Sequence, residues 1–213
     1  MEQDTIPTLF LNAGDDGRGT AFFDEYGMKI LPTYLNSAGI AAWTVGNHDF
    51  DNGEKELAAA INKFKFPVLG GNVKSQNPIL RDKIKPYVVL DDFQVVIMGV
   101  STQETAKFSK PDPTTKFEDE IATTKKILAE IQTKILATNP TYKVIALTHI
   151  GYDHDLALAQ ATKGISIIIG GHSHTGMGGM VGQQPADKNL PYPKMVPSAN
   201  PEESVCIVQA SYK

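Results

Sequence analysis

The chain repeatedly places side chains that can bind a metal ion directly after an apolar run. The clearest case is the apolar run at residues 40–45, which is followed after one glycine by Asn47, His48, Asp49 and Asp51. An apolar run that ends at a glycine is typical of a buried strand that leads into a loop. An amide, an imidazole and two carboxylates within five residues exceed the hydrogen-bonding needs of an ordinary turn. The sequence therefore predicts a functional loop at the end of this strand.

Three further predicted strands end in the same way. The apolar runs at 8–13, 142–148 and 165–169 are followed by Asp15, His149 and His172. In α/β architectures functional groups gather at the carboxyl ends of the strands, so we expect these side chains and Asn47 to meet. Taken singly, each has a plainer explanation, since Asp15 could belong to a turn or cap a helix, and a histidine after a strand is usually a satisfied polar residue. Four such strand ends together favour a shared site.

The last of these strand ends carries two histidines. Two glycines precede His172, Ser173 and His174, and alternate residues can turn both imidazoles toward one site while the glycines leave space. Oxygen and nitrogen donors without a thiolate suit Zn, Mn, Fe, Co or a similar divalent ion rather than a structural zinc cage. The only cysteine, Cys206, lies inside an apolar strand pattern and is expected to pack in the core.

His48 and Asp51 are expected to act beside the metal ligands. Asn47 and His48 are neighbours in one loop, so both can face a cavity without both binding metal. A histidine oriented by a nearby carboxylate can serve as a general acid or as a charge-stabilising imidazolium. Two metal ions with an acid beside them fit hydrolysis of a phosphoryl group, because the ions lower the pKa of water and neutralise phosphoryl oxygens.

The rest of the pattern alternates helices with strands. Helices are predicted at 20–38, broken or kinked at Pro32, and at 54–64 and 118–137, with a further short helix that ends at 161. A strand and loop are predicted at 67–73, strands at 87–90, 95–100, near 195–196 and at 205–210, and loops at 102–116 and 177–201. The runs at 87–90 and 95–100 should form a hairpin. Asp153 or Asp155 is expected to cap the helix that ends at 161, with His154 facing solvent.

Composition limits the classes of function. The 213 residues are 41% hydrophobic, enough for one domain with a real core, and the net charge of −4 gives no reason to expect a nucleic acid or an anionic membrane as partner. One cysteine excludes an internal disulfide. We find no run near the ~20 apolar residues of a transmembrane segment, and no signal-peptide pattern at the start.

Four blocks of the sequence resemble the calcineurin-like metallophosphoesterases. These blocks are Gly14-Asp15-x-x-x-Gly19, Gly46-Asn47-His48-Asp49-Phe50-Asp51-Asn52-Gly53, Thr148-His149-x-Gly151-x-x-x-Asp155 and Gly170-Gly171-His172-Ser173-His174-Thr175. Within that superfamily the chain most resembles the 5′-nucleotidases, which also include UDP-sugar hydrolases and apyrases. The resemblance covers essentially the whole chain in the right order. It implies a four-layer α/β/β/α sandwich with mixed sheets and the metal site at one edge.

The resemblance also implies a role for each matched residue. Asp15 would bridge two divalent metal ions, Asn47, His149 and His172 would complete one metal site, and His174 would bind the other ion. His48 would stabilise the transition state or protonate the leaving oxygen, with Asp51 as its partner. The family also begins with a strand bearing Asp-x-His, and nothing before Asp15 matches it. The second metal site is therefore expected to be incomplete here.

The expected function is metal-dependent hydrolysis of nucleoside 5′-monophosphates. We interpret residues 1–213 as one catalytic domain, trimmed at both ends and without the family's C-terminal nucleotide-binding domain, and we expect weak or no activity from this stretch alone. Alternatives are a UDP-sugar hydrolase or cyclic-nucleotide phosphodiesterase on the same metals, a secreted or surface binding protein without catalysis, and a structural domain. The family implies an extracellular, cell-surface or periplasmic location, and the sequence leaves the oligomeric state open.

Overall fold

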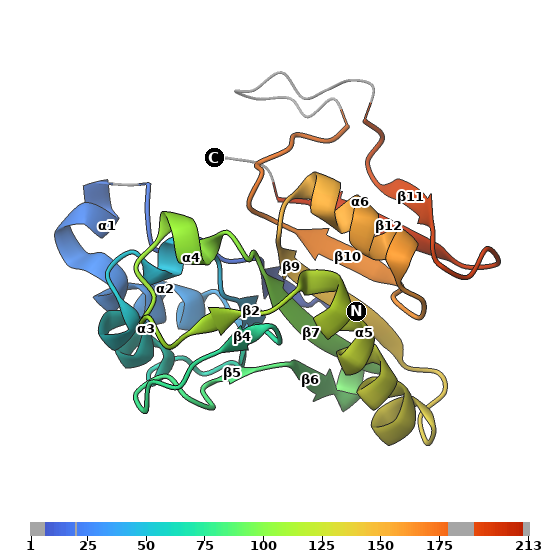
Figure 1. The fold of residues 1–213 in the computed structure, drawn as a ribbon, viewed down its shortest axis with the longest axis horizontal. Helices are drawn as coiled ribbons and strands as arrows, with labels where there is room; N and C mark the ends of the chain where they lie inside the picture. Colours follow the sequence, from blue (N-terminus) through green and yellow to red (C-terminus); the bar gives the residue numbers. More distant parts are fainter. Residues whose placement is uncertain (1–6, 20, 179–189, 211–213) are drawn as a thin grey trace, which may run out of the picture.

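The protein is described by a computed structural model that covers residues 7–19, 21–178 and 190–210. Two β-sheets lie face to face, with helices α1–α3 gathered on one side of the molecule and α5 and α6 on the other (Figure 1). The predicted loop at 177–201 lies partly outside the described residues. No helix in the described part of the chain is long and apolar enough to cross a membrane.

The first sheet carries the strand that precedes the functional loop. Its strands are β1 (Phe10–Asn12), β2 (Ile40–Thr44), β3 (Val68–Leu69) and β5 (Ile84–Lys85), in the order β1-β2-β3-β5. Every neighbouring pair in this sheet is parallel. The carboxyl ends of β1 and β2 therefore point the same way, and the loops that contain Asp15 and Asn47 leave the sheet side by side.

The second sheet is larger and mixed. Its strands are β6 (Tyr87–Leu90), β7 (Val95–Ser101), β9 (Lys143–His149), β10 (Ile167–Gly170), β11 (Lys194–Pro197) and β12 (Ser204–Gln209), in the order β11-β12-β10-β9-β7-β6. The four central strands are parallel and the two edge strands run antiparallel. The predicted hairpin of β6 and β7 is confirmed, with the turn η3 (Asp91–Phe93) between them. A separate antiparallel pair joins β4 (Val73–Lys74) to β8 (Lys116–Phe117).

Three buried clusters separate four layers. Because side chains alternate along a strand, Ala42 of β2 faces the second sheet while its neighbour Trp43 faces the helices. Between the sheets, Ala42 and Leu69 lie in one cluster with Ile97, Ile145 and Leu147. The other two clusters lie between each sheet and its own helices. The predicted four-layer α/β/β/α architecture with a mixed sheet is confirmed.

The helices follow the sequence pattern with local differences. The predicted break near Pro32 is present, since residues 21–37 form α1 (Ala21–Tyr26), the 3-10 turn η1 (Gly27–Lys29) and α2 (Leu31–Ser37). The remaining helical segments are η2 (His48–Phe50), α3 (Glu54–Ile61), α4 (Thr105–Phe108), α5 (Glu120–Ile131), the π-helix η4 (Gln132–Leu136) and α6 (Tyr152–Ala161). Helix α4 was not predicted and lies inside the segment expected to be a loop.

The predicted N-cap of α6 is wrong. Gly151, with a φ of 90°, holds the N-cap position, and no side chain caps the helix there. Asp153 and Asp155 instead lie in its first turn, where the carboxylate of Asp155 is buried against Thr148. A glycine is suited to this positive φ, which an aspartate side chain would strain. His154 is exposed as expected, and its Nδ1 atom lies 2.8 Å from Oε2 of Glu120.

Candidate metal centre

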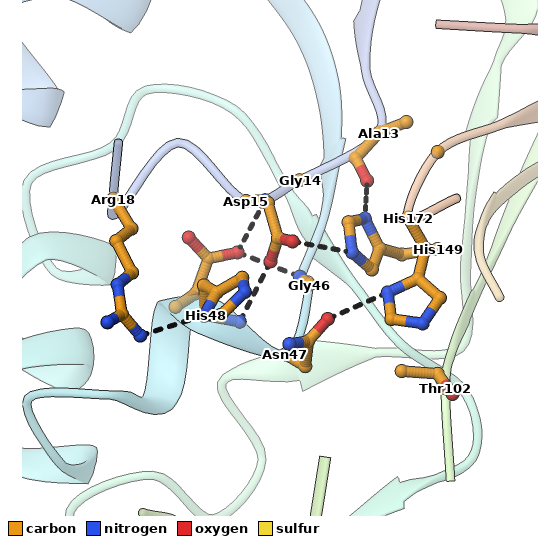
Figure 2. A network of polar contacts seen from close by, with 12 residues as sticks. Ala13, Gly14, Asp15, Arg18, Gly46, Asn47, His48, Thr102, His149 and His172 are labelled. Atoms are coloured by element: carbon orange, nitrogen blue, oxygen red, sulfur yellow. Dashed lines mark hydrogen bonds and ion pairs between the residues drawn. The ribbon is translucent and has the colours of Figure 1, made fainter. Parts of the chain in front are cut away.

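Four strand ends, two from each sheet, meet at one edge of the sandwich. The loops after β1 and β2 bring Asp15 and Asn47 beside His149, the last residue of β9, and His172, two residues after β10 (Figure 2). A hydrogen bond from Thr44 to the backbone of Leu147 joins the two sheets directly beneath this edge. The predicted meeting of strand-end side chains is thus what the fold produces.

One ring nitrogen of His149 donates a hydrogen bond to the backbone, and the other is buried without a hydrogen bond. Its Nδ1 atom lies 2.6 Å from the backbone oxygen of Ala13, so Nδ1 carries the hydrogen and donates it. Its Nε2 atom lies 2.9 Å from Oδ2 of Asp15, close enough for an ion pair, yet it has no hydrogen-bond partner among the described residues. A buried imidazole nitrogen that faces a carboxylate at this distance requires either a proton or a metal cation between the two atoms. The residues present therefore fit a divalent ion.

Asp15 is held in place by backbone groups from the neighbouring loop. Its Oδ1 atom accepts a hydrogen bond of 2.8 Å from the backbone N–H of His48. Burial raises the pKa of Asp15, but the adjacent imidazole of His149 and the His48 backbone N–H outweigh that effect, so the pKa lies below its usual value. The carboxylate is thus charged and positioned in the absence of an ion. Its backbone is left-handed, with a φ of 63°.

His172 and Asn47 form the opposite wall of the site. The Nδ1 atom of His172 lies 2.9 Å from Oδ1 of Asn47, whose side chain is buried. The imidazoles of His149 and His172 approach with ring centroids 5.2 Å apart. One ligand atom from each of Asp15, His149 and His172 lies within 4.8 Å of the other two. Together with Asn47, these three residues could hold one ion.

The Asp49 side chain holds the loops after β1 and β2 through hydrogen bonds to their backbone. The sequence assigned it no role. Its fully buried carboxylate accepts hydrogen bonds from the backbone N–H groups of Gly46 at 2.7 Å, Asp15 at 3.0 Å and Gly17 at 3.2 Å. Burial and the charges of nearby carboxylates raise the pKa of Asp49 well above its usual value, although these N–H groups work against the shift. The carboxylate therefore ties the two loops of the first sheet together. The sequence signal was its place between two expected functional residues.

His48 and Asp51 are paired as expected, and Arg18 joins them. Nδ1 of His48 lies 2.9 Å from Oδ2 of Asp51, and Nη1 of Arg18 donates to the same oxygen at 2.7 Å (Figure 2 draws Arg18 beside His48). Partial burial disfavours the charge of Asp51, but its hydrogen bonds from His48 and Arg18 hold its pKa below the usual value. Arg18 was missed because an exposed arginine in a glycine-rich loop has no distinguishing pattern.

His174 is a predicted ligand outside this group of three residues. It is exposed, with a left-handed φ of 53°. In the part of the chain that the structure describes, the cluster of three ligand residues comprises Asp15, His149 and His172, without His174. Its assignment to a second ion stays a prediction.

A family model for calcineurin-like phosphoesterases matches residues 2–176. Curated relatives include a 5′-nucleotidase of Bos taurus, 36% identical over 95% of this chain and 35% of that protein, and a snake venom 5′-nucleotidase of Naja atra, 36% identical over 78% of this chain and 32% of that protein. The chain thus spans about a third of the length of these relatives.

Solved structures give the same assignment. A 5′-nucleotidase precursor from Thermus thermophilus has a TM-score of 0.84 and 35% identity, covering 94% of this chain and 39% of that one. An NAD nucleotidase from Haemophilus influenzae has a TM-score of 0.83 and 30% identity, covering 94% of this chain and 35% of that one. The family match over most of the chain and the shared fold agree with the meeting of the strand-end side chains at one edge of the sandwich. The chain therefore belongs to the calcineurin-like phosphoesterase domains of the 5′-nucleotidase family.

Proposed function

We propose that the protein hydrolyses nucleoside 5′-monophosphates with the help of divalent metal ions. The observation that carries this proposal is the buried Nε2 atom of His149, which faces the Asp15 carboxylate at 2.9 Å without a hydrogen bond. The similarity to 5′-nucleotidases supports the substrate class. Because the chain spans about a third of those relatives, the activity is proposed for the protein at its full length.

Asp15, Asn47, His149 and His172 would hold one ion. As the family resemblance implies, Asp15 and His174 would contribute to a site for a second ion, and residues 1–213 contain no Asp-x-His pair. Bound divalent ions lower the pKa of water and neutralise the charge of phosphoryl oxygens. Zn and Mn suit the mixed nitrogen and oxygen donors.

His48 would supply the proton to the leaving oxygen. Asp51 holds the Nδ1 side of the ring at 2.9 Å, which leaves Nε2 as the nitrogen that meets the substrate. Arg18 binds the same carboxylate oxygen and keeps it charged and oriented. The backbone N–H of His48 bonds to Asp15, so the acid and the metal ligand are placed relative to each other by one short segment.

A dinucleotide is a second candidate substrate for hydrolysis at this site. Its support is the 30% identity to an NAD nucleotidase over 94% of this chain. UDP-sugar hydrolysis and cyclic-nucleotide hydrolysis would use the same metals. Assays should therefore compare nucleoside monophosphates with NAD.

We further propose an extracellular or surface location, supported by relatives that are named as venom proteins.

Metal content tests the site. The wild-type chain is loaded with Zn or Mn and analysed for bound metal beside Asp15→Ala and His172→Ala. The matched controls are Asp153→Ala and His154→Ala, which remove an exposed carboxylate and an exposed imidazole on α6. Loss of metal in the first pair alone supports the site, and a stoichiometry near one supports the incomplete second site. A stoichiometry near two would mean an additional ligand, and no bound metal would overturn the centre.

Turnover tests the function separately. The full-length protein with added Mn or Zn should release phosphate from nucleoside 5′-monophosphates. Phosphate release from none of the nucleotides would overturn the proposed activity even if the chain binds metal, and would favour a binding protein that keeps the fold.

A further inference from the structure

A fifth strand end reaches the metal centre. Strand β7 is parallel to β9, and its last residue, Ser101, is paired in register with His149. The chain that leaves β7 therefore begins beside a proposed ligand, as do the loops after β1, β2 and β10. Thr102, the next residue, is drawn with His172 among the residues of the site in Figure 2. The acid carried by this fifth strand end is Glu104.

The backbone around Glu104 is fixed by buried side chains. Thr102 and Thr105 are both fully or almost fully buried, and Oγ1 of Thr105 donates to the backbone oxygen of Thr102 at 2.7 Å. The N–H of Glu104 donates to Oγ1 of Thr102 at 3.2 Å, and the N–H of Gln103 donates to Glu120 at 3.1 Å. These contacts hold the turn on both sides of Glu104. The backbone that carries the Glu104 side chain is thus held by a hydrogen-bonded turn.

The carboxylate of Glu104 lies beside the outer nitrogen of His172. Oε2 of Glu104 is 3.7 Å from Nε2 of His172, while Nδ1 of the same ring is 2.9 Å from Oδ1 of Asn47. The distance of 3.7 Å is within reach of an ion pair and longer than a hydrogen bond. The two nitrogens of His172 therefore face different partners, one inside the site and one at its edge.

We propose that Glu104 is a positioning residue that holds the ring hydrogen of His172 on Nε2 and so leaves Nδ1 as the nitrogen offered to a divalent ion. This inference rests on the proposed metal site. Ligand histidines almost always donate their second N–H to a carboxylate, a carbonyl or water, which fixes the tautomer and the ring orientation. Glu104 is the carboxylate beside this nitrogen, and a shift of about half an ångström in its half-exposed side chain would bring it into hydrogen-bond range.

The distance between His172 and Asn47 supports this assignment. Without an ion, Nδ1–H of His172 can donate to Oδ1 of Asn47 across 2.9 Å. The same two atoms would both be donors to an ion in the site, since imidazole nitrogens and amide oxygens are ligands of divalent ions. Nδ1 must then lose its hydrogen, which moves to Nε2 on the side of Glu104.

His149 provides the opposite arrangement in the same site. Its Nδ1–H donates to the carbonyl of Ala13 at 2.6 Å and its Nε2 faces Asp15. The two proposed imidazole ligands thus use different nitrogens, and each is set by the partner of its other nitrogen.

Zinc affinity measured by calorimetry on the metal-free wild-type chain tests the role of Glu104. Glu104→Ala should weaken binding about 10–100-fold. Glu104→Gln should weaken it less, because the amide oxygen still accepts the Nε2 hydrogen. Glu118→Ala, which removes another exposed acid near the same loop, should bind zinc like wild type. The melting temperature of metal-free Glu104→Ala should match that of wild type, since the side chain is about half exposed (48%).

The tautomer gives an independent readout. Nitrogen-15 NMR of the zinc-loaded wild type should show the hydrogen of His172 on Nε2, and Glu104→Ala should show that signal weakened or exchanging with water. Equal zinc affinity and an unchanged His172 spectrum in Glu104→Ala would overturn the role of Glu104 while leaving the metal site intact. A wild-type chain that binds no zinc would instead overturn the metal site itself, and the role of Glu104 with it.

Discussion

Oγ1 of Thr44 donates a hydrogen bond of 2.8 Å to the backbone oxygen of Leu147, which links β2 of one sheet to β9 of the other. Both residues are fully buried. Thr44 lies three residues before Asn47, and Leu147 lies two residues before His149. The bond therefore sets the position of one strand end relative to the other, at the point where the two sheets contribute different proposed ligands to one candidate metal centre.

Thr44→Val tests the contribution of this contact. The valine keeps the shape of the side chain and removes the donor, so the free energy of unfolding should fall by about 1 kcal/mol. Urea unfolding measures the difference. Thr44→Ser keeps the hydroxyl and should recover part of the lost stability, after allowance for the methyl group that the substitution removes. A valine variant as stable as wild type would show that the hydroxyl contributes nothing to joining the sheets.

Gly14→Ala should be strongly destabilising. A Cβ at Gly14 would lie 2.4 Å from the backbone oxygen of Thr44 and 2.6 Å from the backbone nitrogen of Gly46, and the φ of 89° is unfavourable for any side chain. Steric overlap and the left-handed conformation together should cost about 2–5 kcal/mol. Thermal unfolding with calorimetry measures the loss.

Gly39→Ala is the matched control for this substitution. Gly39 has a φ of 69°, and a Cβ there would meet no described atom within 4 Å. Its cost should be the backbone term alone, about 1–2 kcal/mol. Equal losses at both positions would contradict the close approach of the β1 and β2 loops as the reason for Gly14.

Asp155 should make stability depend on pH. Burial, above all, raises the pKa of this carboxyl well above its usual value, against the hydrogen bond from Thr148, and the charge of Glu120 adds to the rise. A raised folded pKa means that the contribution to stability is fully present below the unfolded pKa of about 3.9 and is lost as the pH rises through the folded pKa. Asp155→Asn stays neutral and should lack this loss.

Urea unfolding of the metal-free chain between pH 4 and pH 8 checks the Asp155 prediction. The stability of wild type minus that of Asp155→Asn should fall as the pH rises. Asp153→Asn, which changes an exposed carboxylate on the same helix, should instead run parallel to wild type. Parallel curves for Asp155→Asn would mean that the buried carboxyl is ionised without cost.

His48→Gln should separate catalysis from metal binding. The side chain of His48 is paired with Asp51, whereas only its backbone N–H bonds to Asp15, and the substitution keeps that N–H. Removal of a general acid typically lowers kcat by about 10²–10⁴-fold. In the full-length protein we expect that loss with zinc affinity near wild type. An unchanged kcat would exclude His48 as the proton donor, and a large loss of zinc would instead make it a ligand.

Strand ends were predictable because apolar runs and the residues after them are local features of the sequence. The runs before Asn47 and His149 locate β2 and β9, and parallel strands place their ends at one edge. The interruption at Pro32 was predictable for the same reason, since proline acts on its own helix.

Residues whose role depends on contacts across the fold were not predictable. Arg18 and Glu104 lie in loops without periodicity, and their partners Asp51 and His172 are distant in sequence. The N-cap of α6 was misassigned because aspartate is a common N-cap residue. Only the packing of α6 against β9 and β10 shows that Asp155 is buried. Asp49 is a similar case, because its three backbone donors come from two different loops.

The left-handed backbone at Asp15, His172 and His174, with φ values of 63°, 77° and 53°, raises the conformational free energy of the folded chain. Such a conformation costs a residue with a side chain about 1–3 kcal/mol, and glycine adopts it freely. Glycine at these three positions would remove this backbone cost. The chain thus places one carboxylate and two imidazoles where the backbone favours glycine, and holding them there lowers the stability of the fold.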